Sequence, residues 1–256
     1  MTTQAYHVTR HTFQAARQLA DLGAEHRASR LHGHGFELMA VGQSDHGWDL
    51  LNDEVASLCH QLDYQDLNGR LDTVPNDRAI LNWFAARLSP SSVARLALKT
   101  APDTFARLIP QPDNALSVAQ WFYFEAAHQL PNVPAGHKCG RMHGHGFAVK
   151  IECLVGPDQC TEDLRDQIDQ AWAPLHQSLH LACLNDLSGL ENPTSEHLAL
   201  WLWQRLSGLD SLISIGVNET PSAGCVFDGQ DMRIWKQQTL DAAVQLAHAN
   251  ADDPRR

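Results

Sequence analysis

The feature that most limits how this chain can fold is an internal repeat. FQAARQL at 13–19 returns as FEAAHQL at 124–130, and the His-Gly-His that begins at His32 returns at His143, both 111 positions later. Two further matches follow at offsets of 117 and 118: LDYQDLN at 62–68 with LHLACLN at 179–185, and Trp83 with Trp201. Such self-similarity is typical of a repeated structural unit. We therefore predict two homologous domains, residues 1–112 and 113–256.

Within each half, the hydrophobic pattern predicts strands, then two helices, then closing strands. HGFELMAVG at 34–42 and HGFAVKIECLVG at 145–156 are expected to be strands, and 161–175 has apolar residues at helical spacing. A second helix is expected at 192–206 and another at 237–250, with two closing strands at 212–227 and 232–235. Each half is thus predicted as ββααββ, an α+β fold with a four-stranded antiparallel sheet and two helices on one face.

Charge and composition narrow the class of partner. A formal net charge of −11 argues against a basic surface for nucleic acid or acidic membranes, so we expect a small-molecule partner. We see neither a signal peptide nor a run long enough to cross a membrane, and expect a cytoplasmic protein. The six cysteines lie in no tight framework and are expected to be free thiols.

Three of the fifteen histidines form a pattern suited to metal binding. His143 and His145 are two residues apart in a predicted strand, so their imidazoles point to the same face. His128, in FEAAHQL, lies on a preceding strand that can pair with this one in a hairpin. Three neutral imidazoles with an open fourth position are typical of a catalytic zinc site. The alternative is that each histidine is a surface residue or a hydrogen-bonded core residue.

The first half is expected to lack this metal site. His32 and His34 are present, but Arg17 takes the place of His128, and a guanidinium repels a cation instead of binding it. Ala28 likewise stands where the second half has Cys139. Loss of the ligand together with loss of the thiol indicates a relic site whose scaffold survives.

The order of these motifs resembles that of the 6-pyruvoyltetrahydropterin synthase and 6-carboxytetrahydropterin synthase family. The second half shows FEAAHQL, then CGRMHGHGF, then NPTSEHLA, then VNET. The three-residue gap between Cys139 and His143 is similar to that of the bacterial 6-carboxytetrahydropterin synthases. The resemblance covers roughly 110 residues of the second half and extends more weakly over the first. It implies the tunnelling fold, in which ββααββ units assemble side by side into a barrel with active sites between units.

The resemblance also implies a substrate, 7,8-dihydroneopterin triphosphate, and roles for several residues. Cys139 beside Lys138 would be a thiolate that moves a proton near the metal, the alternative being an ordinary buried cysteine. Glu219 would anchor the pterin ring through two hydrogen bonds, whereas the first half has Thr100 at the matching position. Two further residues match positions that line the same pocket, although a capping box would explain them about as well: Thr194 and Glu196.

The chain departs from the family at the proton relay. Family enzymes have Asp-His in an LDHxxLN segment, but the second half has His180 and Leu181 there, and the first half has Asp63 and Tyr64. In one interpretation, Asp63 and Tyr64 from the first half complement Cys139 of the second. Alternatively, His180 serves alone as acid or base, or the activity is weakened or altered.

These observations leave functions of different classes open. The first is a zinc-dependent carbon–oxygen lyase on the route to deazaguanine-modified tRNA (queuosine) or in a related pterin pathway. The second is a non-catalytic pterin-binding or assembly protein, and a third is an enzyme with a changed reaction. If family units form stacked rings of three, a tandem chain would form a homotrimer with three working sites.

Overall fold

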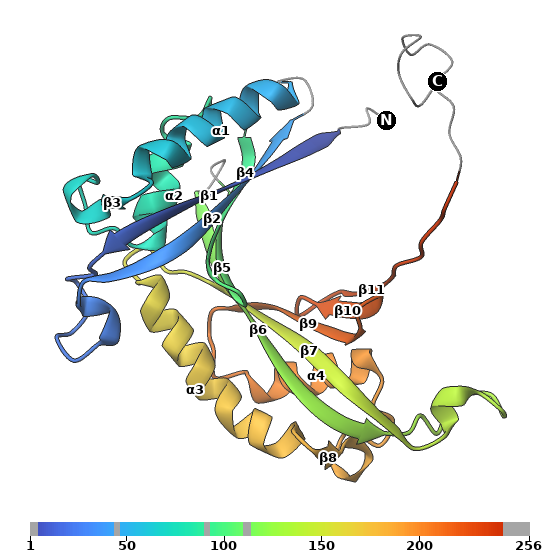
Figure 1. The fold of residues 1–256 in the computed structure, drawn as a ribbon. Coiled ribbons are helices and arrows are strands. Elements are labelled where there is room, and N and C mark those ends of the chain that lie inside the picture. Colours follow the sequence, from blue (N-terminus) through green and yellow to red (C-terminus); the bar gives the residue numbers. More distant parts are fainter. Residues whose placement is uncertain (1–4, 44–46, 90–92, 110–113, 243–256) are drawn as a thin grey trace.

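The computed structural model describes residues 5–43, 47–89, 93–109 and 114–242, and its strands form one sheet (Figure 1). The strand order is β11-β10-β9-β7-β6-β5-β4-β2-β1-β3, and β8 pairs with β6 off this path. The strands of the first half are β1 (Tyr6–Arg17), β2 (His32–Gln43), β3 (Gln65–Asp66), β4 (Val93–Ala101) and β5 (Thr104–Ile109). Those of the second half are β6 (Ala115–His128), β7 (His143–Leu154), β8 (Ala182–Cys183), β9 (Leu212–Thr220), β10 (Ala223–Phe227) and β11 (Met232–Lys236).

The helices divide in the same way between the two halves. Figure 1 shows α1 and α2 beside the strands of the first half, and α3 and α4 beside those of the second. Their bounds are α1 (Trp48–Leu62), α2 (Asp77–Ala85), α3 (Thr161–Leu179) and α4 (Ser195–Arg205). Up to β10 the element order of the second half repeats that of the first, strand, strand, helix, short strand, helix, strand, strand. The chain therefore has a mixed α+β fold.

The two faces of the sheet differ because side chains alternate along each strand. On β7, Phe147, Val149 and Ile151 are buried in the core that the helices cover, and we call this side the helix face. Lys150 and Glu152 point to the opposite side, which we call the open face. A functional group can therefore be assigned to one face or the other from its position in the strand.

Corresponding phenylalanines occupy corresponding places in the core. Phe13 of β1 stacks on Phe36 of β2 with ring centroids 4.8 Å apart, and Phe124 of β6 stacks on Phe147 of β7 at 5.0 Å. Each pair lies directly opposite across an antiparallel ladder. These cross-strand pairs fix the register of both hairpins, and with it the positions of the histidines farther along the strands.

The closing segment differs from the sequence prediction. The stretch 212–227 is two strands, β9 and β10, because the chain turns at Pro221–Ser222, and β11 adds a third strand. The second half therefore has six strands, two more than ββααββ, because β8 and the division of 212–227 add one each. The helix expected at 237–250 is wrong for 237–242, which are neither helix nor strand, and residues 243–250 lie outside the described residues. None of the helices in the described part of the chain is long and apolar enough to cross a membrane.

Candidate metal centre

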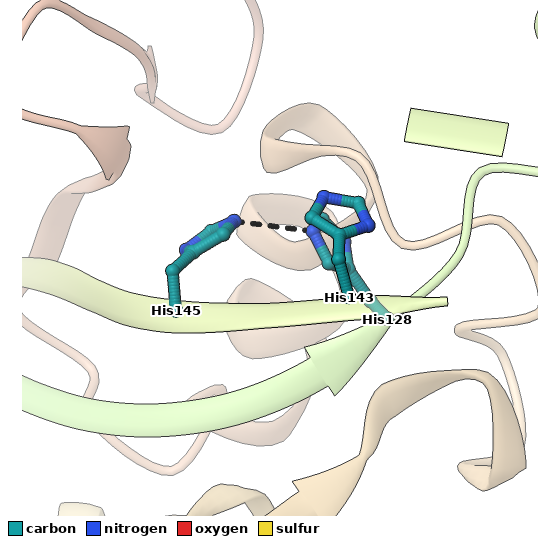
Figure 2. Close-up of side chains that lie close together, drawn as sticks. All are labelled: His128, His143 and His145. Atoms are coloured by element: carbon teal, nitrogen blue, oxygen red, sulfur yellow. Dashed lines mark hydrogen bonds between the residues drawn. The ribbon is translucent and has the colours of Figure 1, made fainter. Parts of the chain in front are cut away.

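Three histidines meet at the end of the β6–β7 hairpin, on the helix face. His128 lies directly opposite His143, and His145 is two residues farther along β7 (Figure 2). One ligand atom from each ring lies within 4.8 Å of the other two, and no other such group of three occurs among the described residues. The structure thus brings together the residues that the sequence predicts as metal ligands.

The hydrogen bonds of the three rings leave the Nε2 atoms facing the cluster. The Nδ1 atoms of His128, His143 and His145 donate to the carbonyls of Pro193 (3.2 Å), Arg141 (2.8 Å) and Gly146 (3.0 Å). A ring protonated at Nδ1 has its lone pair at Nε2, the arrangement that outer carbonyl partners impose on metal-binding histidines. The Nε2 atoms of His128 and His145 are 3.2 Å apart. Two nitrogens bound to one tetrahedral zinc would be about 3.3 Å apart, so the donor set fits this ion.

Burial also favours the form of His128 that can bind a metal. Its side chain is fully buried, and burial lowers its pKa, although the Pro193 hydrogen bond and Glu219 oppose the shift. The imidazole is therefore neutral near pH 7, and a neutral ring is the one that ligates a cation.

A pocket of about 450 Å³ opens beside the cluster. Cys139 and Glu219 line it together with two of the histidines, and the remaining lining residues are Lys138, Arg141, Met142 and Thr220. Cys139 lies in a short 3-10 turn (Lys138–Gly140), where its backbone N–H donates to His137 Nδ1 at 3.2 Å. Glu219 Oε1 is 3.6 Å from His128 Nε2 and 3.7 Å from His145 Nε2. One cavity thus holds imidazoles, a thiol, a carboxylate and two cations.

Thr194 and Glu196 have a local structural role. Thr194 is the N-cap of α4, and its side-chain oxygen accepts a hydrogen bond from the backbone N–H of His197. Glu196 lies in the first turn of the helix and accepts from Ser195 Oγ at 3.3 Å. Neither residue lines the pocket that contains Cys139. Their place in substrate binding stays a prediction.

His180 and Asp63 have equivalent positions in the two halves. Asp63 Oδ1 accepts a hydrogen bond from the backbone N–H of Gln14 at 2.8 Å, and His180 Nδ1 accepts from that of Glu125 at 3.2 Å. His180 therefore replaces the aspartate as an acceptor. Neither side chain lines the Cys139 pocket, and β1 is separated from β6 by three strands. Any contact between Asp63 and Cys139 would have to come from a second chain.

The residues that follow share an unusual backbone conformation. Tyr64 has a φ of 54° and Leu181 a φ of 60°, and both side chains are 79% exposed. Bulky residues rarely adopt this left-handed region, which points to a geometry held by its surroundings. The backbone N–H of each donates at 2.6 Å to the neighbouring strand, Tyr64 to Gln14 and Leu181 to Glu125. The two halves thus share the backbone conformation of this segment, but neither has an Asp-His pair in it.

In the first half, Arg17 takes the structural place of His128. Its Nη1 donates to the carbonyl of Pro75, as His128 donates to that of Pro193. The guanidinium is fully buried and pairs with Asp77 at 2.8 Å and Glu162 at 2.7 Å. Burial and the charge of Arg17 lower the pKa of His34 to about 4. Ala28 is buried, and Thr100 lines a separate pocket that also contains His32 and His34.

Sequence reasoning missed the groups that orient the three clustered histidines. The carbonyls of Pro193, Arg141 and Gly146 hold the three rings, and a backbone carbonyl has no sequence signature. It also missed Arg141 as a cation of the pocket. A signal was present, since Arg30 and Arg141 both lie two residues before the first histidine of His-Gly-His.

Comparisons with known proteins find similarity to pterin synthases. The family model described as 6-pyruvoyl tetrahydropterin synthase matches residues 117–230. The 6-carboxy-5,6,7,8-tetrahydropterin synthase of Synechocystis sp. is 38% identical, over 39% of this chain and 82% of that protein. The structure of Caenorhabditis elegans 6-pyruvoyl tetrahydropterin synthase is 19% identical with a TM-score of 0.38, covering 48% of this chain and 96% of that one.

Proposed function

The chain belongs to the 6-pyruvoyl tetrahydropterin synthase family, and on that premise we propose that it is a zinc-dependent carbon–oxygen lyase acting on 7,8-dihydroneopterin triphosphate. The observation that supports this proposal is the pocket in which two of the clustered histidines meet Cys139 and Glu219. Acting on that substrate, the protein would serve the 6-carboxytetrahydropterin route toward queuosine, or a related pterin pathway.

Each group in the pocket would have a distinct role in this reaction. Zinc held by the three clustered imidazoles would supply Lewis acidity that lowers the pKa of the substrate's side-chain hydroxyls. Glu219 would accept two hydrogen bonds from the 2-amino and ring N–H groups of the pterin. Cys139, as a thiolate, would take the proton from the side-chain carbon. Lys138 and Arg141 would offset the charge of the triphosphate.

The assembly is part of the same proposal. Residues 1–112 and 113–256 would be two tandem tunnelling-fold units, the first without a metal site, and the chains would form a homotrimer in the cytoplasm. Asp63 and Tyr64 of one chain would then lie beside Cys139 of the next. Two observations support this. Within one chain neither residue lines the Cys139 pocket, and both have a fixed conformation, because Asp63 accepts a hydrogen bond from the backbone N–H of Gln14 and Tyr64 has a left-handed backbone.

A second candidate is a pterin-binding protein without lyase activity. It is favoured by His180 and Leu181, because the first is used as a hydrogen-bond acceptor and the second is apolar. The retained thiol favours catalysis, since a binding protein has little use for a cysteine beside a metal. A third candidate keeps catalysis but cleaves the pterin side chain without eliminating phosphate.

Incubation of the zinc-loaded protein with 7,8-dihydroneopterin triphosphate tests these candidates. We expect release of triphosphate and acetaldehyde, loss of that release in Cys139→Ala, and little change in the matched variant Cys183→Ala, whose thiol does not line the pocket. Pterin binding without release would favour the binding protein, and acetaldehyde without triphosphate would favour the changed reaction. We also expect about one zinc per chain by metal analysis, and two would contradict a metal-free first half.

A further inference from the structure

A second cluster of charged side chains lies on the open face, away from the histidine pocket. Glu152 of β7 is 2% exposed, and both of its oxygens are fully used. Oε1 is bound by Arg107 of β5 and by Ser117 Oγ at 2.8 Å. Oε2 is bound by Lys150 Nζ and by Ser214 Oγ, each at 3.2 Å. The carboxylate therefore has no remaining acceptor site for a further cation.

A third cation, Arg95 of β4, adjoins this cluster. Arg107 lies directly opposite Ala97, so Arg95 is its diagonal neighbour on the same face, within reach of a long side chain. Arg95 has no hydrogen-bond or ion-pair partner among the described residues, and its Nε is buried without one. The other carboxylate on this side of β2, Glu37, lies opposite Lys99. Three cations thus lie near one carboxylate, Glu152, whose acceptor sites are all occupied.

Burial, and then repulsion between neighbouring cations, lowers the pKa of two of these three side chains. Burial, and then repulsion from Arg107, lowers the pKa of Lys150 to about 8. Burial, and then repulsion from Arg95, lowers the pKa of Arg107. Neither side chain is sealed, because Arg107 is 27% and Lys150 18% exposed. Solvent, and a solute in it, can therefore reach the charged ends.

The cross-strand neighbours of the cations on this face are mostly small. Ala97 and Ser117 lie opposite Arg107, and Gly216 lies opposite Lys150, whose other cross-strand neighbour, Trp121, is large. Arginine and lysine donors combined with serine hydroxyls are the groups that proteins use to hold phosphate oxygens.

We propose that Arg95, Arg107 and Lys150 form a binding site for a phosphate-type oxyanion on the open face of the sheet, where β5 of the first half meets β6 of the second. The anion accepts from the guanidinium N–H groups that Glu152 leaves unpaired and from the Lys150 ammonium. The site uses neither the metal nor the pocket of Cys139, so it stands whether or not the proposed lyase activity does.

Calorimetric titration of the full chain with sodium orthophosphate, and separately with tripolyphosphate, tests this site at constant ionic strength. Loss of one charge-assisted contact is expected to weaken binding about tenfold or more in Arg95→Gln and in Lys150→Gln. Arg10→Gln is the matched control, because it removes one cation from the same face of β1 and should leave the dissociation constant within about twofold. Because Lys138 is proposed to offset the charge of the triphosphate in the histidine pocket, Lys138→Gln identifies phosphate bound there, and the losses in Arg95→Gln and Lys150→Gln should persist in that background.

The possible outcomes are distinguished by comparing the affinities of the two anions and by following the pKa of Lys150 with NMR. Equal affinity per phosphate group indicates a site for one oxyanion, whereas much tighter tripolyphosphate binding indicates a longer anion lying across the same three cations. In the wild-type chain, NMR of the lysine side chains should show the pKa of Lys150 rising when phosphate binds, even if a variant fails to fold. The proposal is overturned if orthophosphate does not bind at millimolar concentration, or if Arg10→Gln and Arg95→Gln weaken binding equally.

Discussion

At the scale of single residues, Glu219 has two possible partners. It lines the pocket as an anchor for the pterin would, yet its Oε1 is within 4 Å of two histidine Nε2 atoms. The proposed role as a pterin anchor and a role as a metal ligand lead to different results on substitution.

Glu219→Gln distinguishes these roles. The amide keeps the shape but offers one acceptor oxygen where the pterin edge requires two, so we expect pterin affinity to fall about tenfold or more. Zinc content should stay at the wild-type level, because the three imidazoles remain. Equilibrium binding of a pterin and metal analysis of the same preparation measure both quantities. Loss of zinc with unchanged pterin binding would assign the carboxylate to the metal.

The pKa of His34 provides a test of the environment beside Arg17 in the first half. Because its pKa in the folded chain is about 4, well below the ordinary value, only the unfolded chain takes up this proton as the pH falls from about 6.5 to 4. The stabilisation is thus complete above pH 6.5 and is lost as the pH falls toward 4. Thermal unfolding of wild type and His34→Gln should show a shallower decline over this range in the variant. Parallel curves would contradict a neutral, half-buried imidazole.

The spacing of the histidines in the sequence predicted that they cluster, but the sequence did not predict the surroundings of Arg17. The strand period places His143 and His145 on one face, and the hairpin register brings His128 opposite. That Arg17 would be buried could not be read from its own half, because Glu162, one of the acids that neutralise it, lies on α3, 145 positions away.

At the scale of elements, an ion network fastens α2 and α3 to β1. Asp77 at the start of α2 accepts from Arg17 at 2.8 Å and from Arg165 of α3 at 2.6 Å, and Glu162 pairs with both arginines. Burial alone would raise the pKa of Asp77, but Arg165 and Arg17 hold it below its ordinary value. Two cations and two anions, whose formal charges balance, thus occupy in the first half the place that the histidine cluster has in the second.

Asp77→Asn should destabilise the chain strongly. Removing one partner of a buried network leaves the two arginines with Glu162 as their remaining anion, and we expect the free energy of unfolding to fall by about 3–5 kcal/mol. Asp72→Asn is the control, because this exposed aspartate lies in the loop just before α2. Urea denaturation followed by circular dichroism measures both. Similar stability of the two variants would show that the network contributes little.

Periodicity predicted the long elements well and the short ones poorly. The helix expected at 161–175 is α3, which runs on past Pro174 to Leu179. The two-residue strands β3 and β8 had no signal, because a two-residue segment shows no period and its parallel pairing depends on the fold. The split between β9 and β10 was missed although the polar residues and proline of NETPS at 218–222 are a turn signal.

At the scale of the whole molecule, the junction of the halves suggests how chains would join. Inside the chain, β5 pairs with β6 along Thr104–Ile109, and α3 covers the junction next to β6. In the element order β10 corresponds to β5, and β1 corresponds to β6. If two chains join as the two halves do, β1 of one chain would therefore pair with β10 of the next. In the structure β11 holds that position, pairing with β10 from Ala223↔Lys236 to Phe227↔Met232. Apolar side chains are exposed at both ends of the sheet: Tyr6, Val8, Trp48, Leu50 and Ile234.

A disulfide between β10 and β11 tests whether β11 must leave before chains join. Ile234 lies directly opposite Cys225, so Ile234→Cys places two cysteines at a spacing that allows a disulfide. If β1 of a neighbour takes the place of β11, the oxidised variant should remain monomeric, whereas the reduced variant should assemble like the wild type. Light scattering after gel filtration measures the mass in each state, and Ile234→Cys combined with Cys225→Ala controls for oxidant. Trimers of the oxidised chain would instead show that the outer edge of β11 is itself the contact, and monomers in every state would overturn the proposed trimer.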